Sequence, residues 1–314
     1  MTKTLIDPRV SSLTAHIGPS VMSKLNDPNV MEILLNPDGK LWVEEFGTPM
    51  TLFGTMPAQQ ANLVLKAIAG YHDTVVNADN PILECELPID GSRFEGIIPP
   101  ITTSPTFTIR KKAVKIFTLD EYVKSGTLTE TQCQSLKKAI AEHKNILIVG
   151  GTGSGKTTLA NALIDGMVKH DETERIVMIE DTNELQCSAP NFVTLRANST
   201  TTMNQLLRAT LRLRPDRILI GEVRGGEALA LLKAWNTGHP GGIATIHADS
   251  AVMGLSRVED CVSEATATLN KTLIANAINV IVFIKKTRQG RCIEEIIEVI
   301  GFEAGQYHTQ PICV

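Results

Sequence analysis

The sequence predicts an α/β fold in which a smaller α/β unit precedes a larger one built on a mostly parallel sheet covered on both faces. From residue 145 onward, short apolar runs alternate with helical segments, which is the pattern of a buried parallel sheet. The first third of the chain carries hairpin signals instead. The chain has 314 residues, 43% of them hydrophobic and 20% charged, so it has the material for two ordinary globular domains.

Turn sequences punctuate the first third. Asn36–Gly39 separates two strand-like runs, and Asp90-Gly91 separates two more. Between these hairpins, apolar residues recur at helical spacing over Pro57–Tyr71. The predicted strands are Glu32–Leu35, Leu41–Phe46, Ile82–Leu87, Arg93–Ile98 and Thr106–Arg110.

A connecting region follows the last of these strands. Thr118 with Glu121, and Thr127 with Glu130, both have the capping-box form that marks the start of a helix. Two helices are therefore expected there, and the second is expected to reach His143. The predicted organisation is an N-terminal domain over residues 1–112, a linker over 113–130 and a second domain over 131–314.

The second half of the chain supplies the strands of the predicted parallel sheet. Helical segments at Thr157–Met167, Leu206–Leu213 and Glu227–Trp235 separate several of them. The last three runs have no helix between them and are typical of antiparallel strands, with a basic turn at Lys285–Arg291. The predicted strands are Ile146–Val149, Arg175–Ile179, Val193–Leu195, Arg217–Ile220, Ile243–Ile246, Val280–Lys285, Ile293–Phe302 and Gln306–Pro311.

A phosphate-binding loop (P-loop) follows the first of these strands. The segment fits G-x-x-x-x-G-K-S/T and lies between a buried strand and a helix, the context that this motif requires. Glycines let backbone N–H groups curl around phosphate oxygens, and the helix N-terminus adds partial positive charge. Lys156 is expected to reach the β- and γ-phosphates and the Thr157 hydroxyl to coordinate Mg²⁺. The predicted nucleotide-binding residues are Gly150, Gly151, Thr152, Gly153, Ser154, Gly155, Lys156, Thr157 and Thr158.

Two further strands end in carboxylates that would stand beside this loop. Glu180 follows one apolar run, and Glu222 follows another that resembles a Walker B strand with Gly221 in place of the usual aspartate. Because the carboxyl ends of parallel strands meet at one edge of a sheet, either carboxylate could orient water or hold Mg²⁺. Glu222 is predicted as a metal ligand together with Thr157. The sequence leaves open whether Glu180 or Glu222 is the base.

A histidine and several arginines complete the set of candidates. His247 ends a further apolar strand at the same edge, where an imidazole could touch the γ-phosphate and report its loss. Phosphoryl transfer spreads negative charge over the γ-phosphate oxygens, which a nearby arginine stabilises. The candidate arginines are Arg93 and Arg110 in the first unit and Arg208 and Arg212 in the second.

Taken together, these segments resemble the traffic ATPases of type II secretion, type IV pili and type IV secretion. The hallmarks of that superfamily are a P-loop, an acidic "Asp box", an atypical Walker B motif and a "His box", in that order. Here they appear as GGTGSGKT, IEDTNEL, RPDRILIGEVRGGE and TGHPGGIATIHA, and the first-domain stretches GSRFEGIIPP and FTIRKK also fit. The chain length and the residues of these motifs are most similar to those of conjugal transfer ATPases of the TrbB type. No tetracysteine zinc element is present in the sequence, which disfavours the type II secretion branch.

This resemblance implies a homo-hexamer whose subunits have a PAS-like α+β N-terminal domain and a RecA-like P-loop motor domain. It implies that ATP and Mg²⁺ bind between the domains, and that Arg93 and Arg110 approach the γ-phosphate. The implied partners are inner-membrane components of a conjugation or type IV secretion apparatus. Because no signal peptide and no apolar run of ~20 residues is visible, the expected location is cytoplasmic, at the inner face of the inner membrane.

The predicted function is that of an ATP hydrolase that powers pilus assembly or the export of DNA or protein. An ATP-gated assembly or docking module with little hydrolysis remains the alternative. A RecA-like DNA motor is a third hypothesis. The net charge of −4 and the aromatic content of 4% disfavour it, and no sequence-specific binding of nucleic acid is expected.

Two other classes are disfavoured by missing motifs. A GTPase would need the guanine-reading pattern N/T-K-x-D, and Asn270-Lys271-Thr272-Leu273 lacks its aspartate. The six cysteines are scattered without a C-x-x-C pair, so they are expected to be reduced thiols and not zinc ligands.

Overall fold

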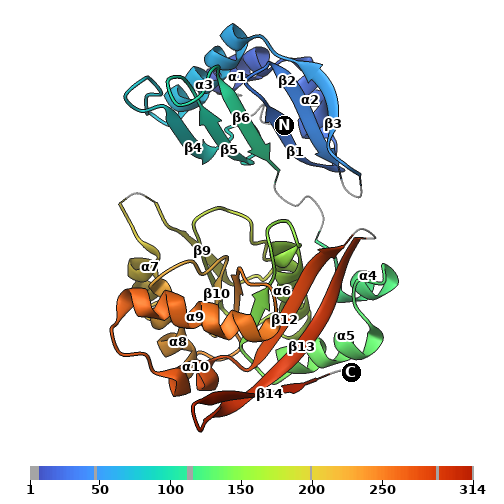
Figure 1. Ribbon diagram of the computed structural model, residues 1–314, viewed down its shortest axis with the longest axis vertical. Helices are drawn as coiled ribbons and strands as arrows, with labels where there is room; N and C mark the ends of the chain where they lie inside the picture. The colour runs from blue at the N-terminus through green and yellow to red at the C-terminus, as the bar shows by residue number, and fades with distance from the viewer. Residues whose placement is uncertain (1–6, 46–47, 112–115, 199, 288–289, 313–314) are drawn as a thin grey trace. The chain divides into compact units, whose positions relative to one another are not determined.

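The computed structural model describes residues 7–45, 48–111, 116–198, 200–287 and 290–312 (Figure 1). The chain separates into two compact units, Met1–Lys115 and Ile116–Val314. Helix α4 (Leu119–Lys124), which lies in the range predicted as a linker, belongs to the second unit and packs against α5 (Glu130–Ala141) and α6 (Lys156–His170). The domain limits drawn from the sequence remain a prediction.

The first unit is an antiparallel sheet with three helices packed into the same core. Its strand order is β3-β2-β1-β6-β5-β4, and every neighbouring pair is antiparallel. Alternate residues such as Ile33, Leu35, Leu41 and Val43 point into the core. The elements are α1 (Pro8–Ile17), α2 (Pro19–Asn26), β1 (Val30–Leu35), β2 (Lys40–Glu45), β3 (Thr51–Thr55), α3 (Ala58–Tyr71), β4 (Ile82–Glu86), β5 (Arg93–Ile97) and β6 (Thr106–Arg110).

Three elements of this unit were not predicted. Helices α1 and α2 carry proline at their first turn, and the Asp7 side chain accepts a hydrogen bond from the N–H of Arg9, so a start signal was present but overlooked. Strand β3 has no fully buried residue, so its sequence has no alternation to detect. Phe46, at the end of a predicted strand, lies outside the described residues.

The second unit is built on a sheet of order β14-β13-β12-β7-β11-β10-β8-β9. The pairings from β12 through to β9 are parallel, whereas β12–β13 and β13–β14 are antiparallel. Figure 1 shows these last strands side by side in red. The strands are β7 (Ile146–Val149), β8 (Ile176–Glu180), β9 (Phe192–Arg196), β10 (Arg217–Ile220), β11 (Ile243–Ile246), β12 (Val280–Thr287), β13 (Gly290–Glu303) and β14 (Gln306–Pro311).

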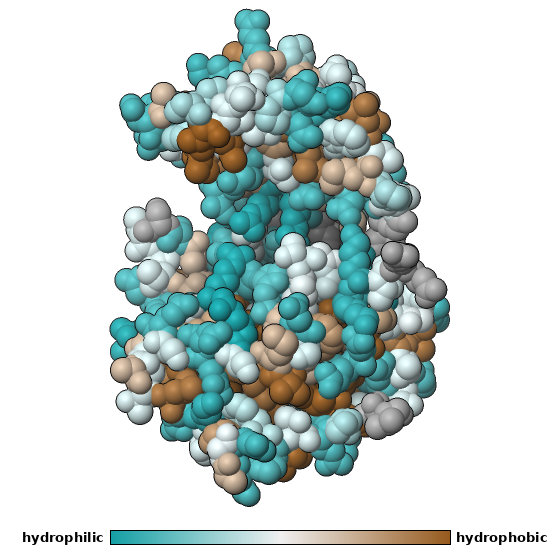
Figure 2. Space-filling view, in the orientation of Figure 1, coloured by the Kyte–Doolittle hydropathy of each residue, from teal (hydrophilic) through white to brown (hydrophobic). Residues whose placement is uncertain are grey.

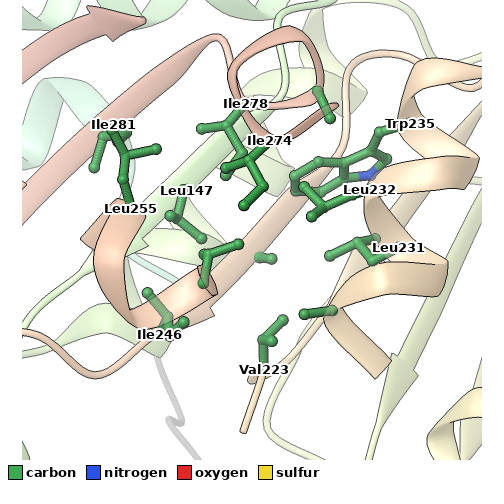
Figure 3. Close-up of a cluster of buried hydrophobic side chains, with 14 of the residues drawn as sticks. Leu147, Val223, Leu231, Leu232, Trp235, Ile246, Leu255, Ile274, Ile278 and Ile281 are labelled. Atoms are coloured by element: carbon green, nitrogen blue, oxygen red, sulfur yellow. The ribbon is translucent and has the colours of Figure 1, made fainter. Parts of the chain in front are cut away.

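Helices cover both faces of this sheet because its central strands are apolar on both sides. Ile146 and Ile148 of β7 lie in one core with residues of α4, α5 and α6, whereas Leu147 and Val149 lie in another. Figure 3 shows part of that second core, where Trp235, Leu232 and Ile274 pack together. Its helices are α7 (Met203–Thr210), α8 (Glu227–Asn236), α9 (Ala251–Ala265) and α10 (Lys271–Ala277), of which α9 and α10 were not predicted.

The start of α5 differs from the prediction. Thr118 and Glu121 form the expected capping box for α4. The second capping box, however, uses Thr129 and Gln132, and the predicted pair Thr127 and Glu130 does not form it. Glutamine satisfies the same reciprocal pattern as glutamate, so two overlapping signals competed. Tertiary contacts decided between them, because the Thr127 carbonyl accepts a hydrogen bond from the N–H of Ile293 in β13.

The surface in view is mostly hydrophilic on both units, and smaller hydrophobic patches are scattered among the hydrophilic residues (Figure 2). Among the residues that the structure describes, no helix combines the length and apolar composition that crossing a membrane requires.

Candidate active site

The P-loop lies between the end of β7 and the start of α6, and three of its four glycines are required by geometry. Gly153 has φ 68° and Gly155 has φ 99°, in the left-handed region that favours glycine. A Cβ on Gly150 would overlap the carbonyl oxygen of Ile284 in β12 and would lie 2.5 Å from Ser154 Oγ. The loop therefore curls tightly at the N-terminus of a 15-residue helix, where its amides can meet phosphate oxygens.

Lys156 and His247 come together at this loop, as the sequence predicted for residues at one sheet edge. Lys156 is buried, and its Nζ donates hydrogen bonds to the carbonyl oxygens of Gly150 and Gly151, at 2.9 and 3.0 Å. The same Nζ lies 3.2 Å from His247 Nδ1. The lysine is thus held over the loop, at the side of the neighbouring strand β11.

Glu222 lies next to His247 in a chain of charged groups. His247 Nε2 is 2.7 Å from Glu222 Oε1, and Arg224 Nη2 is 2.5 Å from Glu222 Oε2. Arg224 Nη1 in turn contacts Asp181 Oδ2 at 2.5 Å. The Glu222 side chain is only 16% exposed, whereas that of Arg224 is 53% exposed. Glu222 is thus held between an imidazole and a guanidinium beside the P-loop.

Glu180 is placed differently, because its side chain turns back into its own loop. It is 1% exposed, and its Oε2 accepts hydrogen bonds from the N–H groups of Glu184 and Leu185, both at 2.9 Å. Burial raises the pKa of this carboxyl above its usual value, while the two N–H groups act in the opposite direction. These hydrogen bonds hold the turn that follows β8.

That turn brings Glu184 to the P-loop helix, a contact that sequence reasoning missed. Thr157 Oγ1 donates a hydrogen bond to Glu184 Oε2 at 3.1 Å, and Asn161 Nδ2 donates to the Glu184 carbonyl at 3.1 Å. Glu184 stands in the acidic segment IEDTNEL, four residues beyond the strand end. The only signal for it was that it is the third carboxylate in the motif, after Glu180 and Asp181.

The donor set at Thr157 suits Mg²⁺. A hydroxyl and a carboxylate are hard oxygen ligands, and Mg²⁺ commonly takes one or two protein ligands and completes its shell with phosphate oxygens and water. Within the described ranges, no cluster of three or more His, Cys, Asp or Glu residues could hold a metal by itself. The residues fit a metal ion that takes some of its ligands from the protein and the others from a phosphate substrate. Glu222, the other predicted ligand, is engaged by His247 and Arg224.

The predicted arginines divide between the two units. Arg93 in β5 and Arg110 in β6 are register partners, so they stand next to each other, and Arg93 Nη2 contacts Glu84 Oε1 at 2.8 Å. Arg208 in α7 and Arg212 just beyond it are exposed. The roles of these arginines toward a phosphate remain predictions.

Comparison with known proteins agrees with these motifs. A family model described as "Type II/IV secretion system protein" matches residues 18–310. The chain belongs to this secretion family. It is 46% identical over 301 residues to the "Probable conjugal transfer protein TrbB" of Sinorhizobium fredii, covering 96% of this chain and 93% of that protein. It is 44% identical over 311 residues to the "Conjugal transfer protein TrbB" of Rhizobium radiobacter, covering 99% and 96%. The resemblance to TrbB-type proteins is therefore confirmed.

A solved structure supports the fold of this secretion-family chain. The Legionella pneumophila ATPase DotB matches with a TM-score of 0.65 and 18% identity, over 90% of this chain and 81% of that one. The match shows that the two proteins share an α/β fold.

Proposed function

We propose that this chain is a P-loop ATPase that hydrolyses ATP as a homo-hexamer and powers a bacterial conjugation or type IV secretion machine. The observation that carries the proposal is the convergence of Lys156, His247 and Glu222 on a complete P-loop. Membership of the secretion family and similarity to TrbB conjugal transfer proteins support the biological setting. A RecA-like motor domain is proposed for the second unit and a PAS-like domain for the first.

The contacts suggest how the residues share the chemistry. When ATP binds, Lys156 exchanges the carbonyls of Gly150 and Gly151 for β- and γ-phosphate oxygens. Thr157 and Glu184 would hold Mg²⁺, which neutralises charge on those oxygens when bound. Glu222 accepts the proton of the attacking water, and His247 touches the γ-phosphate and responds to its release.

Glu180 acts through Glu184, because its two hydrogen bonds hold the turn that presents Glu184 to Thr157. Arg93 and Arg110 stabilise the negative charge that develops on the γ-phosphate. Release of phosphate then allows the domains to move, and the ring passes this motion to inner-membrane partners. The proposed location is the cytoplasmic face of that membrane.

The test compares wild type with Glu222→Gln, which keeps the size of the side chain but cannot accept the proton. We expect the wild type to hydrolyse ATP as a hexamer, with mass measured with and without ATP. The variant should bind ATP and show a kcat lower by about 10²- to 10⁴-fold. A wild type that binds ATP as a monomer and does not hydrolyse it, even with membrane partners, would favour the ATP-gated docking module instead.

A further inference from the structure

The hairpin of β12 and β13 runs past the P-loop. Strand β12 pairs with β7 in parallel, with Phe283 opposite Val149. Strand β7 stops at Val149 and turns into the P-loop, whereas β12 continues to Thr287. The far end of the hairpin therefore lies beside the loop, on the opposite side of β7 from β11 and His247.

Two side chains of the hairpin touch the glycines of the loop. A Cβ added to Gly155 would lie 2.9 Å from Arg291 Cδ and 3.2 Å from Arg291 Nε. The same Cβ would lie 3.6 Å from Ile284 Cδ1, and one on Gly150 would lie 3.3 Å from Ile284 Cγ2. Because Gly155 has no side chain, the stem of Arg291 packs directly on the backbone where α6 begins, which brings its Nε close to the loop.

The backbone beside Arg291 is firmly held. Two residues further on, the N–H of Ile293 donates to the carbonyl of Thr127 at 2.9 Å, and the Ile293 carbonyl accepts from Gln132 Nε2 at 3.3 Å. Lys285, which is the register partner of Cys292, forms an ion pair with Glu294. The hairpin thus presents Arg291 to the loop from a fixed position, which reduces the entropy lost when it binds an anion.

We infer that Arg291 contacts the α-phosphate of the bound nucleotide. This inference rests on the proposed function, since it places a second cation on the phosphate chain of ATP. Lys156 and His247 mark the γ-phosphate end of the site on the β11 side, and Arg291 stands on the β12 side of the same loop. A guanidinium offers a planar fork of N–H donors that matches phosphate oxygens. The charge on the α-phosphate changes little during hydrolysis, so Arg291 strengthens binding without accelerating the chemical step.

The experiment uses Arg291→Met, which keeps the packing of the stem on Gly155 and removes the charge. Its matched control is Lys286→Met, the register partner on the same hairpin, which is exposed and carries the same charge. We expect Arg291→Met to raise the Kd of ADP and the KM of ATP about tenfold, the effect of one charge-assisted hydrogen bond, with kcat unchanged within about twofold. Arg291→Lys should recover part of the affinity. Equal thermal unfolding midpoints would show that both variants fold.

Base selectivity distinguishes a contact with the phosphate chain from a contact with the base. A contact with the α-phosphate predicts that the KM values of ATP and CTP rise by the same factor, whereas a loss confined to ATP would overturn the assignment in favour of base stacking. An unchanged Kd for ADP in Arg291→Met, or an equal loss in Lys286→Met, would overturn the inference while the wild type still hydrolyses ATP. A wild type that binds neither ATP nor ADP would instead contradict the proposed function, and this inference with it.

Discussion

Thr157 Oγ1 donates a hydrogen bond to Glu184 Oε2 at 3.1 Å, which joins the first turn of the P-loop helix to the acidic turn after β8. The two residues are 27 positions apart, and the turn that carries Glu184 is held by two hydrogen bonds from its N–H groups to Glu180 and by one from Asn161 to the Glu184 carbonyl. It places a carboxylate beside the hydroxyl predicted to bind Mg²⁺.

Glu184→Gln keeps the hydrogen bond to Thr157 but removes the negative charge. We expect the Mg²⁺ concentration for half-maximal ATPase activity to rise about tenfold, in the range seen when groups around a bound metal are changed. Glu172→Gln, on an exposed loop before β8, serves as the charge-matched control and should leave the Mg²⁺ requirement unchanged. The same Mg²⁺ requirement in wild type and Glu184→Gln would contradict the proposed metal role.

Lys156→Ala should abolish turnover and leave the fold intact. The lysine Nζ bonds carbonyls of a surface loop, so its loss opens no large cavity in the core, whereas it removes the cation that meets the β- and γ-phosphates. We expect kcat to fall by about 10²- to 10³-fold or more, measured as phosphate release, with an unchanged circular dichroism spectrum. Normal ATP hydrolysis by this variant would contradict the proposed mechanism.

Removing Arg93 and Arg110 tests the contribution of the first unit to catalysis. If they stabilise charge on the γ-phosphate, each change to alanine should lower kcat by about 10³-fold and leave ADP affinity nearly unchanged. Arg208→Ala and Arg212→Ala, in the second unit, are the matched comparisons. Equal activity in all four variants would remove the arginine-finger role.

The buried carboxyl of Glu180 makes stability depend on pH. Burial raises its pKa in the folded protein above the ordinary 4.5, so the folded state binds this proton more tightly than the unfolded state. The resulting stabilisation is fully present below 4.5 and is lost as the pH rises through the folded pKa. The free energy of unfolding of wild type, relative to Glu180→Gln, should therefore decrease as pH rises. Urea unfolding from about pH 4 to pH 8 measures this difference, and a flat or rising difference would argue against it.

Arg217 and Glu174 form a buried ion pair at the start of β10, away from the P-loop edge. Arg217 is 0% exposed, its Nε lies 2.5 Å from Glu174 Oε2, and it donates to the carbonyls of Ile140 and Gly241. Arg217→Met should lower the free energy of unfolding by about 3–5 kcal/mol, because it removes the guanidinium from the buried Glu174 carboxylate, whose other oxygen lies 3.3 Å from His143 Nε2. Combining it with Glu174→Gln should recover part of the loss in urea unfolding. A double variant as unstable as the sum of the single variants would contradict this coupling.

The P-loop, the carboxylate Glu222 and His247 could be predicted from the sequence because each belongs to a short contiguous motif. Such a motif is recognised from residue types at fixed spacing, because its backbone needs particular φ angles. Separate motifs then meet at one edge of the sheet, where the carboxyl ends of the parallel strands lie. The central strands β7, β10 and β11 were predicted with the limits that the structure shows, since their apolar runs are short and sharply bounded. The local sequence fits a capping box at Thr127 and another at Thr129, so it does not predict at which of them the helix begins.

The motifs alone are enough to locate a P-loop at a strand–loop–helix junction and to predict that the acidic and histidine segments lie near it. Which carboxylate meets Thr157 depends on tertiary contacts, because Glu180 and Glu184 are separated by a turn that is held by hydrogen bonds from the Glu184 and Leu185 N–H groups to Glu180. The same is true of the contact between Arg291 and Gly155, which are 136 positions apart, because strand pairing brings the β12–β13 hairpin beside the loop. Contacts of this kind depend on the packing of whole strands, and local sequence carries no signal for them.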